Sequence, residues 1–109
     1  MSYKHTGYLS IAKNKQGLDD LEYRRETKNI IMIILPDKEC KALDELGIFD
    51  IINKKYHLLI DFSETEDIPA EAIEECINLL ESTSYKNGAF AKALRTAQKY
   101  KTYLEVDLS

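Results

Sequence analysis

At residues 56–81 the chain has the sequence YHLLIDFSETEDIPAEAIEECINLLE, and the rest of the protein is arranged around this stretch. The apolar run at residues 56–62 predicts a β-strand that presents one face to the core. Pro69 suits the start of a helix, and the apolar stripe over residues 70–81 predicts that helix. From residue 61 onward the stretch contains eight carboxylates and no lysine or arginine.

Acidic charge is concentrated in the middle of the chain. The 109 residues have a net charge of −4. Residues 37–82 hold four basic and thirteen acidic residues, whereas residues 1–36 have a net charge of +2 and residues 83–109 of +3. A net acidic chain disfavours nucleic acid as the main partner and favours a basic protein.

Three further segments predict β-strands. Residues 30–35 are six apolar residues ended by Pro36, and this pattern is typical of a strand that is buried on both faces. Residues 8–12 predict a short strand, and the alternation at residues 103–108 predicts a half-buried one at the C-terminus.

Helices are predicted between these strands. Residues 37–46 have the spacing of one buried helical face, and Gly47 suits the end of that helix. Residues 48–53 predict a second helical segment, with an extended strand as the alternative, and residues 89–99 predict the last helix. Residues 14–17 predict a turn, whereas residues 18–27 fit a helical turn, a loop or an irregular strand.

Strands that interleave with helices indicate an α/β fold, with α+β as the alternative. We expect a single domain over residues 1–109, built on a sheet of about four strands with helices packed on at least one face. The N-terminus has no apolar signal segment, and no apolar run approaches the ~20 residues of a membrane span. Cys40 and Cys76 lack metal-type spacing and are expected to be reduced thiols. These features predict a cytoplasmic protein.

The residues that carry chemistry form no recognisable catalytic group. The four glycines are scattered, so no phosphate-binding loop is present, and the two histidines have no metal-ligand neighbours. Ser63 lacks the motif of a nucleophile elbow, and Cys76 falls on the apolar stripe of its helix. Asp61 follows a predicted strand without the glycines or lysine of a ligand site. The sequence therefore predicts a protein that is not an enzyme and needs no cofactor or metal.

The acidic stretch is the strongest candidate for a partner-binding site. Acidic runs are often solvated helix faces, but this one forgoes the Glu–Lys pairs that stabilise exposed helices. Its charge is offset either by the basic last helix or by a basic partner, and we favour the partner. An adjoining tyrosine adds an anchor of the kind found at interface hot spots. The predicted partner-binding residues are Asp61, Glu64, Glu66, Asp67, Glu71, Glu74, Glu75 and Tyr85.

Several segments have the style of a known class of proteins. LLIDFSE at residues 58–64 leads into IPAEAIEE at residues 68–75, and NGAFAKAL at residues 87–94 precedes an amphipathic terminal strand. This order resembles small cytoplasmic immunity proteins of bacterial contact-dependent growth inhibition and related polymorphic toxin systems. The resemblance implies an inhibitor that binds a cognate toxin domain, often a nuclease, and occludes its basic active-site cleft. It implies no role for any single residue.

Other functions stay open at this point. Lys92, Arg95 and Lys99 on the last helix suit a small nucleic-acid-binding regulator, which is the main alternative. A small enzyme built from unremarkable residues and a homo-oligomer formed along an exposed strand edge are further alternatives.

Overall fold

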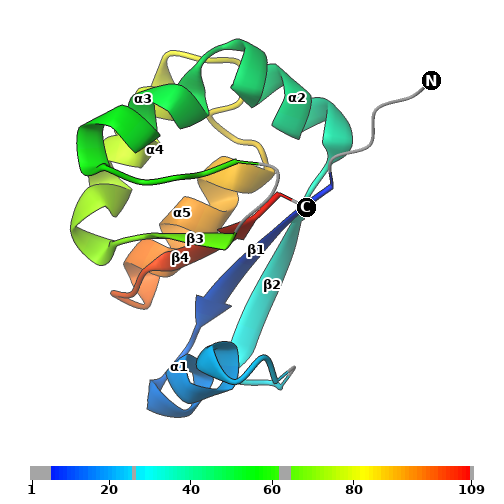
Figure 1. Cartoon of the computed structure of the whole chain (residues 1–109), viewed down its shortest axis with the longest axis vertical. Helices are drawn as coiled ribbons and strands as arrows, with labels where there is room; N and C mark the ends of the chain where they lie inside the picture. Colours follow the sequence, from blue (N-terminus) through cyan, green and yellow to red (C-terminus); the bar gives the residue numbers. More distant parts are fainter. Residues whose placement is uncertain (1–5, 26, 62–64, 109) are drawn as a thin grey trace.

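The structure, a computed structural model, describes residues 6–25, 27–61 and 65–108. Four strands and a set of helices alternate along the chain (Figure 1). The elements are β1 (Gly7–Ala12), α1 (Lys15–Glu22), β2 (Ile30–Leu35), α2 (Asp37–Glu45), α3 (Ile48–Tyr56), β3 (Thr65–Ile68), the 3₁₀ turn η1 (Ala70–Ala72), α4 (Ile73–Glu81), α5 (Ala89–Lys99) and β4 (Leu104–Asp107).

The strands form one sheet in the order β2-β1-β4-β3, and every neighbouring pair is antiparallel. Tyr8 lies between Ile34 and Asp107, and the next residue row on the same face brings Met32, Ser10, Glu105 and Asp67 together. This mixed α/β architecture confirms the predicted fold class, with a four-stranded sheet and helices on one face. The antiparallel pairing places β2 and β3 at the two edges.

The hydrophobic core lies between the sheet and helices α2 to α5. Helix α5 crosses the strands, and its apolar side is fully buried. Phe90 of α5 packs edge to face against Phe49 of α3, with ring centroids 5.7 Å apart. The predicted helix over residues 89–99 has the observed bounds, because its apolar stripe recurs at helical spacing against this core.

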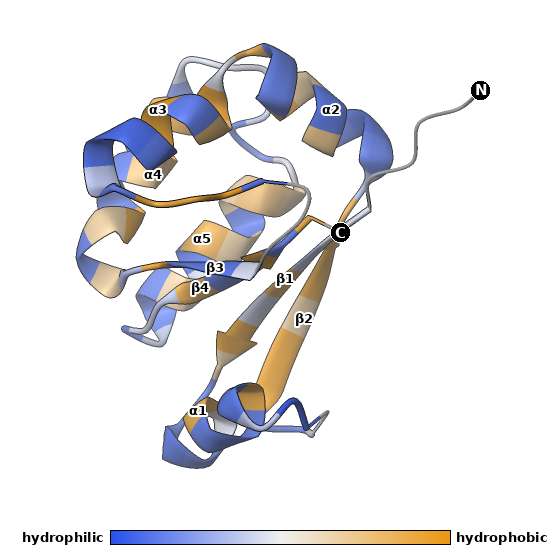
Figure 2. Cartoon of the chain, viewed as in Figure 1, coloured by the Kyte–Doolittle hydropathy of each residue, from blue (hydrophilic) through white to orange (hydrophobic). Residues whose placement is uncertain are grey.

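The opposite, outer face of the sheet is left largely open by the helices, and this corrects the prediction for β2. We expected residues 30–35 to be buried on both faces, but Met32 and Ile34 are 49% and 58% exposed. Only the other face, with Ile31, Ile33 and Leu35, turns toward the core. Figure 2 shows β2 as an apolar strand at the rim of the molecule. The strand is apolar on both sides although one side meets solvent.

The strand predicted at residues 56–62 is also wrong. Tyr56 ends α3, and His57 takes a left-handed backbone conformation with φ of 57°. Residues 58–60 belong to no strand. The Asn53 side chain binds both polar backbone groups of Ile60 at 2.8 and 2.9 Å, in place of a neighbouring strand. The strand lies at Thr65–Ile68 instead. Its sequence, TEDI, has only one apolar residue and so lacks the pattern that predicts a strand. Residue 62, the last of the predicted strand, falls outside the described residues.

The start of the chain also differs from its prediction. Residues 14–17 were expected to form a turn, but Asn14 caps α1 by accepting a 2.8 Å hydrogen bond from the Gly17 N–H. Of the undecided residues 18–27, residues 18–22 complete α1, and residues 23–25 and 27 lie between α1 and β2. Elsewhere Gly47 has φ of 76°, and it ends α2 as predicted and begins α3. Strands β1 and β4 and helices α2, α3 and α4 confirm their predictions.

Candidate binding face of the sheet

A cleft of about 640 Å³ lies on the outer face of the sheet. Its floor is made by outer-face residues of β1, β2 and β4, and its wall by the segment that connects α1 to β2. The lining residues are Tyr8, Ser10, Leu21, Arg24, Arg25, Thr27, Ile30, Met32, Glu105 and Asp107. The cleft therefore combines an apolar side, formed mainly by β2, with charged groups of both signs.

The wall of the cleft is held in place by Asp20, which is only 2% exposed. Its carboxylate accepts hydrogen bonds from Thr27 Oγ1 at 2.6 Å and from Gln16 Nε2 at 3.0 Å. Arg25 approaches the same carboxylate at 3.7 Å. The Thr27 and Gln16 hydrogen bonds lower the pKa of Asp20 from its ordinary value, so the carboxylate stays ionised at neutral pH. Asp20 thus joins α1 to the connection that precedes β2.

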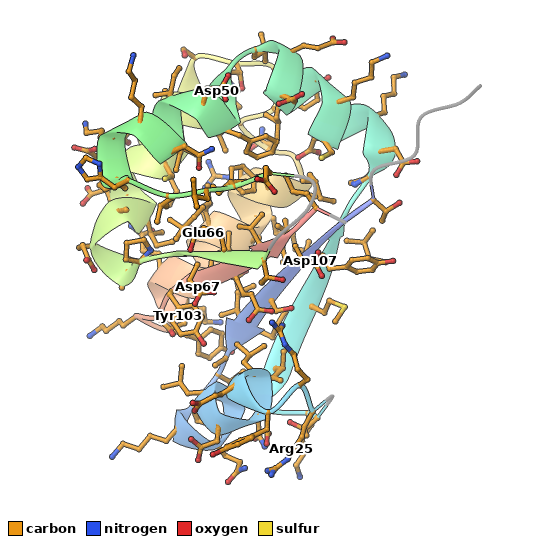
Figure 3. The ribbon with its side chains drawn as sticks, in the orientation of Figure 1. Arg25, Asp50, Glu66, Asp67, Tyr103 and Asp107 are labelled. Atoms are coloured by element: carbon orange, nitrogen blue, oxygen red, sulfur yellow. The ribbon has the colours of Figure 1, made fainter. Side chains whose placement is uncertain are left out.

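On the outer face of the sheet, carboxylates gather on β4 and β3, the two strands farthest from β2. Asp67 of β3 lies directly opposite Glu105 of β4, and Figure 3 shows Asp67 and Asp107 on these strands and Tyr103 just before β4. Partial burial raises the pKa of both Asp67 and Glu105, and the neighbouring Glu66 and Asp67 charges respectively add to the effect. Arg24 opposes this rise, because its guanidinium forms a 2.8 Å salt bridge with Glu105.

We predict that Asp67→Asn stabilises the protein at neutral pH. A carboxyl whose folded pKa is raised penalises folding above that pKa, and the penalty disappears below the unfolded value. Like charges directly opposite each other in a sheet destabilise it by a few tenths of a kcal/mol, so the gain at pH 7 is about 0.5 kcal/mol. Urea denaturation at pH 7 and at decreasing pH measures the gain, which should vanish as Asp67 becomes protonated.

The matched control for this prediction is Asp19→Asn, since Asp19 is exposed on α1 away from the β3–β4 pair. Its free energy of unfolding should stay within about 0.2 kcal/mol of the parent value. An Asp67→Asn variant that is less stable than the parent at pH 7 would contradict the account of this charge pair.

The structure divides the predicted partner-binding residues into two groups. Some are already used within the protein. Glu75 forms a 2.6 Å salt bridge with Lys55 and accepts a hydrogen bond from the Tyr56 hydroxyl. Glu66 accepts hydrogen bonds from the backbone N–H groups of Leu59 at 2.9 Å and Asp67 at 3.0 Å. These two carboxylates stabilise the fold.

Glu71 and Glu74 belong to the second group. Glu71 is exposed in η1 and Glu74 in the first turn of α4, and within residues 6–25, 27–61 and 65–108 neither side chain makes a hydrogen bond or ion pair. Asp61 is exposed after α3, and Glu64 lies outside the described residues. Tyr85 follows the opposite end of α4 and packs partly buried against the core. It therefore does not join the acidic group that it was predicted to accompany.

The basic last helix offsets one acid of the stretch. Arg95 on α5 forms a 3.1 Å salt bridge with Glu81 and donates a 2.8 Å hydrogen bond to the backbone carbonyl of Lys86. With Lys92 and Lys99 it lines a shallow hollow of about 390 Å³. Within the protein, Arg95 of the last helix therefore balances the charge of Glu81, and Lys55 of α3 balances the charge of Glu75.

Both cysteines are buried free thiols. Burial raises the pKa of Cys40 to about 11 and that of Cys76 to about 12, so neither is a thiolate at neutral pH. Among the described residues, no three His, Cys, Asp or Glu side chains gather in a way that suits a metal ion. In the same residues, no helix has the length and apolar character needed to cross a membrane.

The cleft was missed by sequence reasoning because it depends on strand register. Residues from four separate segments meet only once β1 is paired with both β2 and β4. One signal did precede it: the β2 sequence is apolar at every position, including those that an edge strand turns to solvent.

Comparisons with known proteins found no relative of this chain. The chain matches no protein-family model, and it has no significant match among curated proteins or among solved structures.

Proposed function

We propose that this protein is a cytoplasmic immunity protein that binds a cognate bacterial toxin domain and neutralises it without catalysis. The partner is a basic protein, and a nuclease with a basic active-site cleft fits it best. The observation that carries the proposal is the open outer face of the sheet, where exposed Met32 and Ile34 lie on the same face as Glu105 and Asp67.

The composition of this face supports protein binding. Methionine and aromatic residues are enriched in the cores of protein interfaces, and charged residues surround them. A contiguous exposed apolar patch of this kind often marks an interaction site. The carboxylates next to it favour a cationic partner, because a nearby positive charge would offset the partial burial and the lesser repulsion that raise the pKa of Asp67 and Glu105.

Inhibition follows from occupancy of the partner's cleft. A nuclease cleft is lined with cations that hold nucleic-acid phosphates. The exposed carboxylates of Glu71 and Glu74 would attract such a cleft during diffusion, and the outer sheet face would then cover it. Once the cleft is covered, phosphates are excluded and the toxin is inactive although its catalytic groups are intact.

Titration of the chain into a purified candidate toxin domain tests this function, with candidates chosen from the open reading frames that neighbour its gene. Toxin activity should fall linearly and reach zero at a fixed, stoichiometric ratio, and the toxin should be recovered intact when the complex is separated in denaturant. Loss of activity at substoichiometric amounts of the chain, or a cleaved or modified toxin, would show an enzyme instead.

The nucleic-acid-binding regulator is the second candidate function. It rests on Lys92 and Lys99, which are exposed on α5 beside Arg95. A gel-shift assay with duplex DNA and with RNA at moderate salt separates the two candidates, because phosphate contacts dominate such binding.

A further inference from the structure

The cleft on the outer face contains a buried polar group that lacks a partner. Ser10 is 5% exposed and lies in the floor of the cleft. Its hydroxyl makes no hydrogen bond to any residue in the described part of the chain. Buried hydroxyl groups normally have a hydrogen-bond partner, and leaving one unpaired is costly. The floor of the cleft is therefore suited to a ligand that brings a donor or an acceptor.

The neighbours of Ser10 define the chemistry of that ligand. In the register of the sheet, Ser10 lies directly opposite Glu105 on one side and Met32 on the other. Directly opposite residues have Cβ atoms about 5 Å apart, so one group can bond to Ser10 and Glu105 together. A ligand that fits has a cationic donor at its end and an apolar stem that lies along Met32.

The protein already places a guanidinium group at this position. Arg24 extends from the cleft wall to Glu105, and the two groups form a 2.8 Å salt bridge. Arg24 is 65% exposed along its side chain and has a left-handed backbone φ of 57°, which is unfavourable for a residue other than glycine. The Arg24 side chain is thus open to solvent and to competition, whereas the Glu105 side chain that it covers is 12% exposed.

We propose that the cleft receives an arginine side chain of the partner protein, which displaces Arg24 from Glu105. The incoming guanidinium would donate to the Glu105 carboxylate and to the Ser10 hydroxyl, and its stem would pack against Met32. Arginine suits this role better than lysine, because its planar group has five donors and is more weakly hydrated. This inference rests on the proposed function and identifies the contact that anchors the partner.

The test uses the isolated chain and a small probe, N-acetyl-arginine-N-methylamide, titrated into isotope-labelled protein and followed by NMR. Saturable shifts should be centred on Ser10, Met32 and Glu105, with a dissociation constant on the order of millimolar. The isosteric but uncharged citrulline analogue should bind about tenfold more weakly, because its contact with Glu105 is no longer charge-assisted.

Variants separate displacement of Arg24 from general electrostatics. Arg24→Ala should raise probe affinity several-fold, whereas Lys28→Ala, which removes a nearby exposed charge, should change it by less than about twofold. Glu105→Gln should weaken binding about tenfold, and Ser10→Ala should weaken it with the spectrum otherwise unchanged. Equal shifts with the arginine and citrulline probes, or unchanged affinity in Arg24→Ala, would overturn the proposal.

The result of this test does not decide whether the proposed function is correct. The probe experiment involves no toxin, and the toxin titration does not depend on Arg24. A chain that inhibits its toxin but ignores the arginine probe would retain the immunity function and lose the anchor assigned to the cleft.

Discussion

Replacement of Glu39 by alanine is expected to lower the free energy of unfolding by about 2 kcal/mol. Glu39 lies on α2, and its two carboxylate oxygens accept hydrogen bonds from the backbone N–H groups of Ala89 at 3.0 Å and Phe90 at 2.9 Å. Helix α5 begins after Gly88, which has no side chain to cap it. The cap therefore comes from a residue about fifty positions earlier in the sequence.

Loss of this carboxylate leaves two helical N–H groups without an acceptor and removes a negative charge from the positive end of the helix dipole. The effect should be large because α5 carries Phe90 and the other residues that cover the sheet. The close approach also explains Gly88, since a Cβ there would lie 2.5 Å from Glu39 Oε1. Thermal and urea denaturation measure the loss.

Two further variants test whether the cap is the cause. Glu45→Ala removes an exposed carboxylate from the same helix, where only a 4.0 Å contact with Lys41 is lost, and should cost less than about 0.5 kcal/mol. Glu39→Gln keeps one acceptor oxygen and should fall between the parent and Glu39→Ala. Equal stability of Glu39→Ala and Glu45→Ala would show that the cap contributes nothing.

Gly17→Ala is the second substitution with a large expected effect. Helix propensity alone predicts stabilisation by up to about 1 kcal/mol, because Gly17 lies inside α1. The packing predicts the opposite. A Cβ at this position would lie 2.3 Å from the backbone oxygen of Asn29 and 3.2 Å from Ala12 Cα. That oxygen also accepts a 2.9 Å hydrogen bond from the Lys13 N–H, so it cannot move without loss.

We expect Gly17→Ala to destabilise the protein by about 2 kcal/mol, which corresponds to a fall in Tm of about 10 °C. The helix must move away from β1 and β2, and the connection that forms the cleft wall moves with it. Lys15→Ala in the same helix is exposed and should leave Tm nearly unchanged. A stabilised Gly17→Ala variant would mean that α1 does not pack closely against Ala12 and Asn29.

The elements with strong local signals could be predicted from the sequence. The apolar stripe of α5 and the glycine between α2 and α3 each depend on residues close together in the chain. Predictions failed where a distant residue changed the outcome. Residues 58–60 are apolar, but Asn53 binds Ile60 in place of a strand. The charged segment at Thr65–Ile68 becomes a strand because β4 pairs with it.

The candidate site could be predicted only in part, for a similar reason. The acidic stretch is visible in the sequence, but its charges do not act together. Glu75 is paired with Lys55 and Glu81 with Arg95, whereas Glu71 and Glu74 make no such contact within the described residues. The cleft joins residues far apart in sequence, such as Ser10, Arg24 and Glu105, and only the strand register brings them together. No local pattern encodes that arrangement.

These contacts decide which carboxylates of the acidic stretch can be reversed without loss of stability. Reversal of Glu75 would break its contacts with Lys55 and Tyr56, so a loss of binding would be mixed with a loss of stability. Glu71 and Glu74 are exposed, and their side chains make no hydrogen bond or ion pair in the described part of the chain, so their reversal changes charge with little effect on the fold.

The central claim is that uncompensated negative charge draws this protein to a basic toxin domain. Its most direct test is the association rate constant of Glu71→Lys/Glu74→Lys with the purified cognate toxin domain, measured by stopped flow at low and high salt. We expect a rate about tenfold below that of the parent at low salt and a flatter salt dependence. The control Asp44→Lys/Glu45→Lys, with the same charge change on α2, should associate faster than the α4 variant. Association of the α4 variant at the parent rate at every salt concentration would contradict the claim.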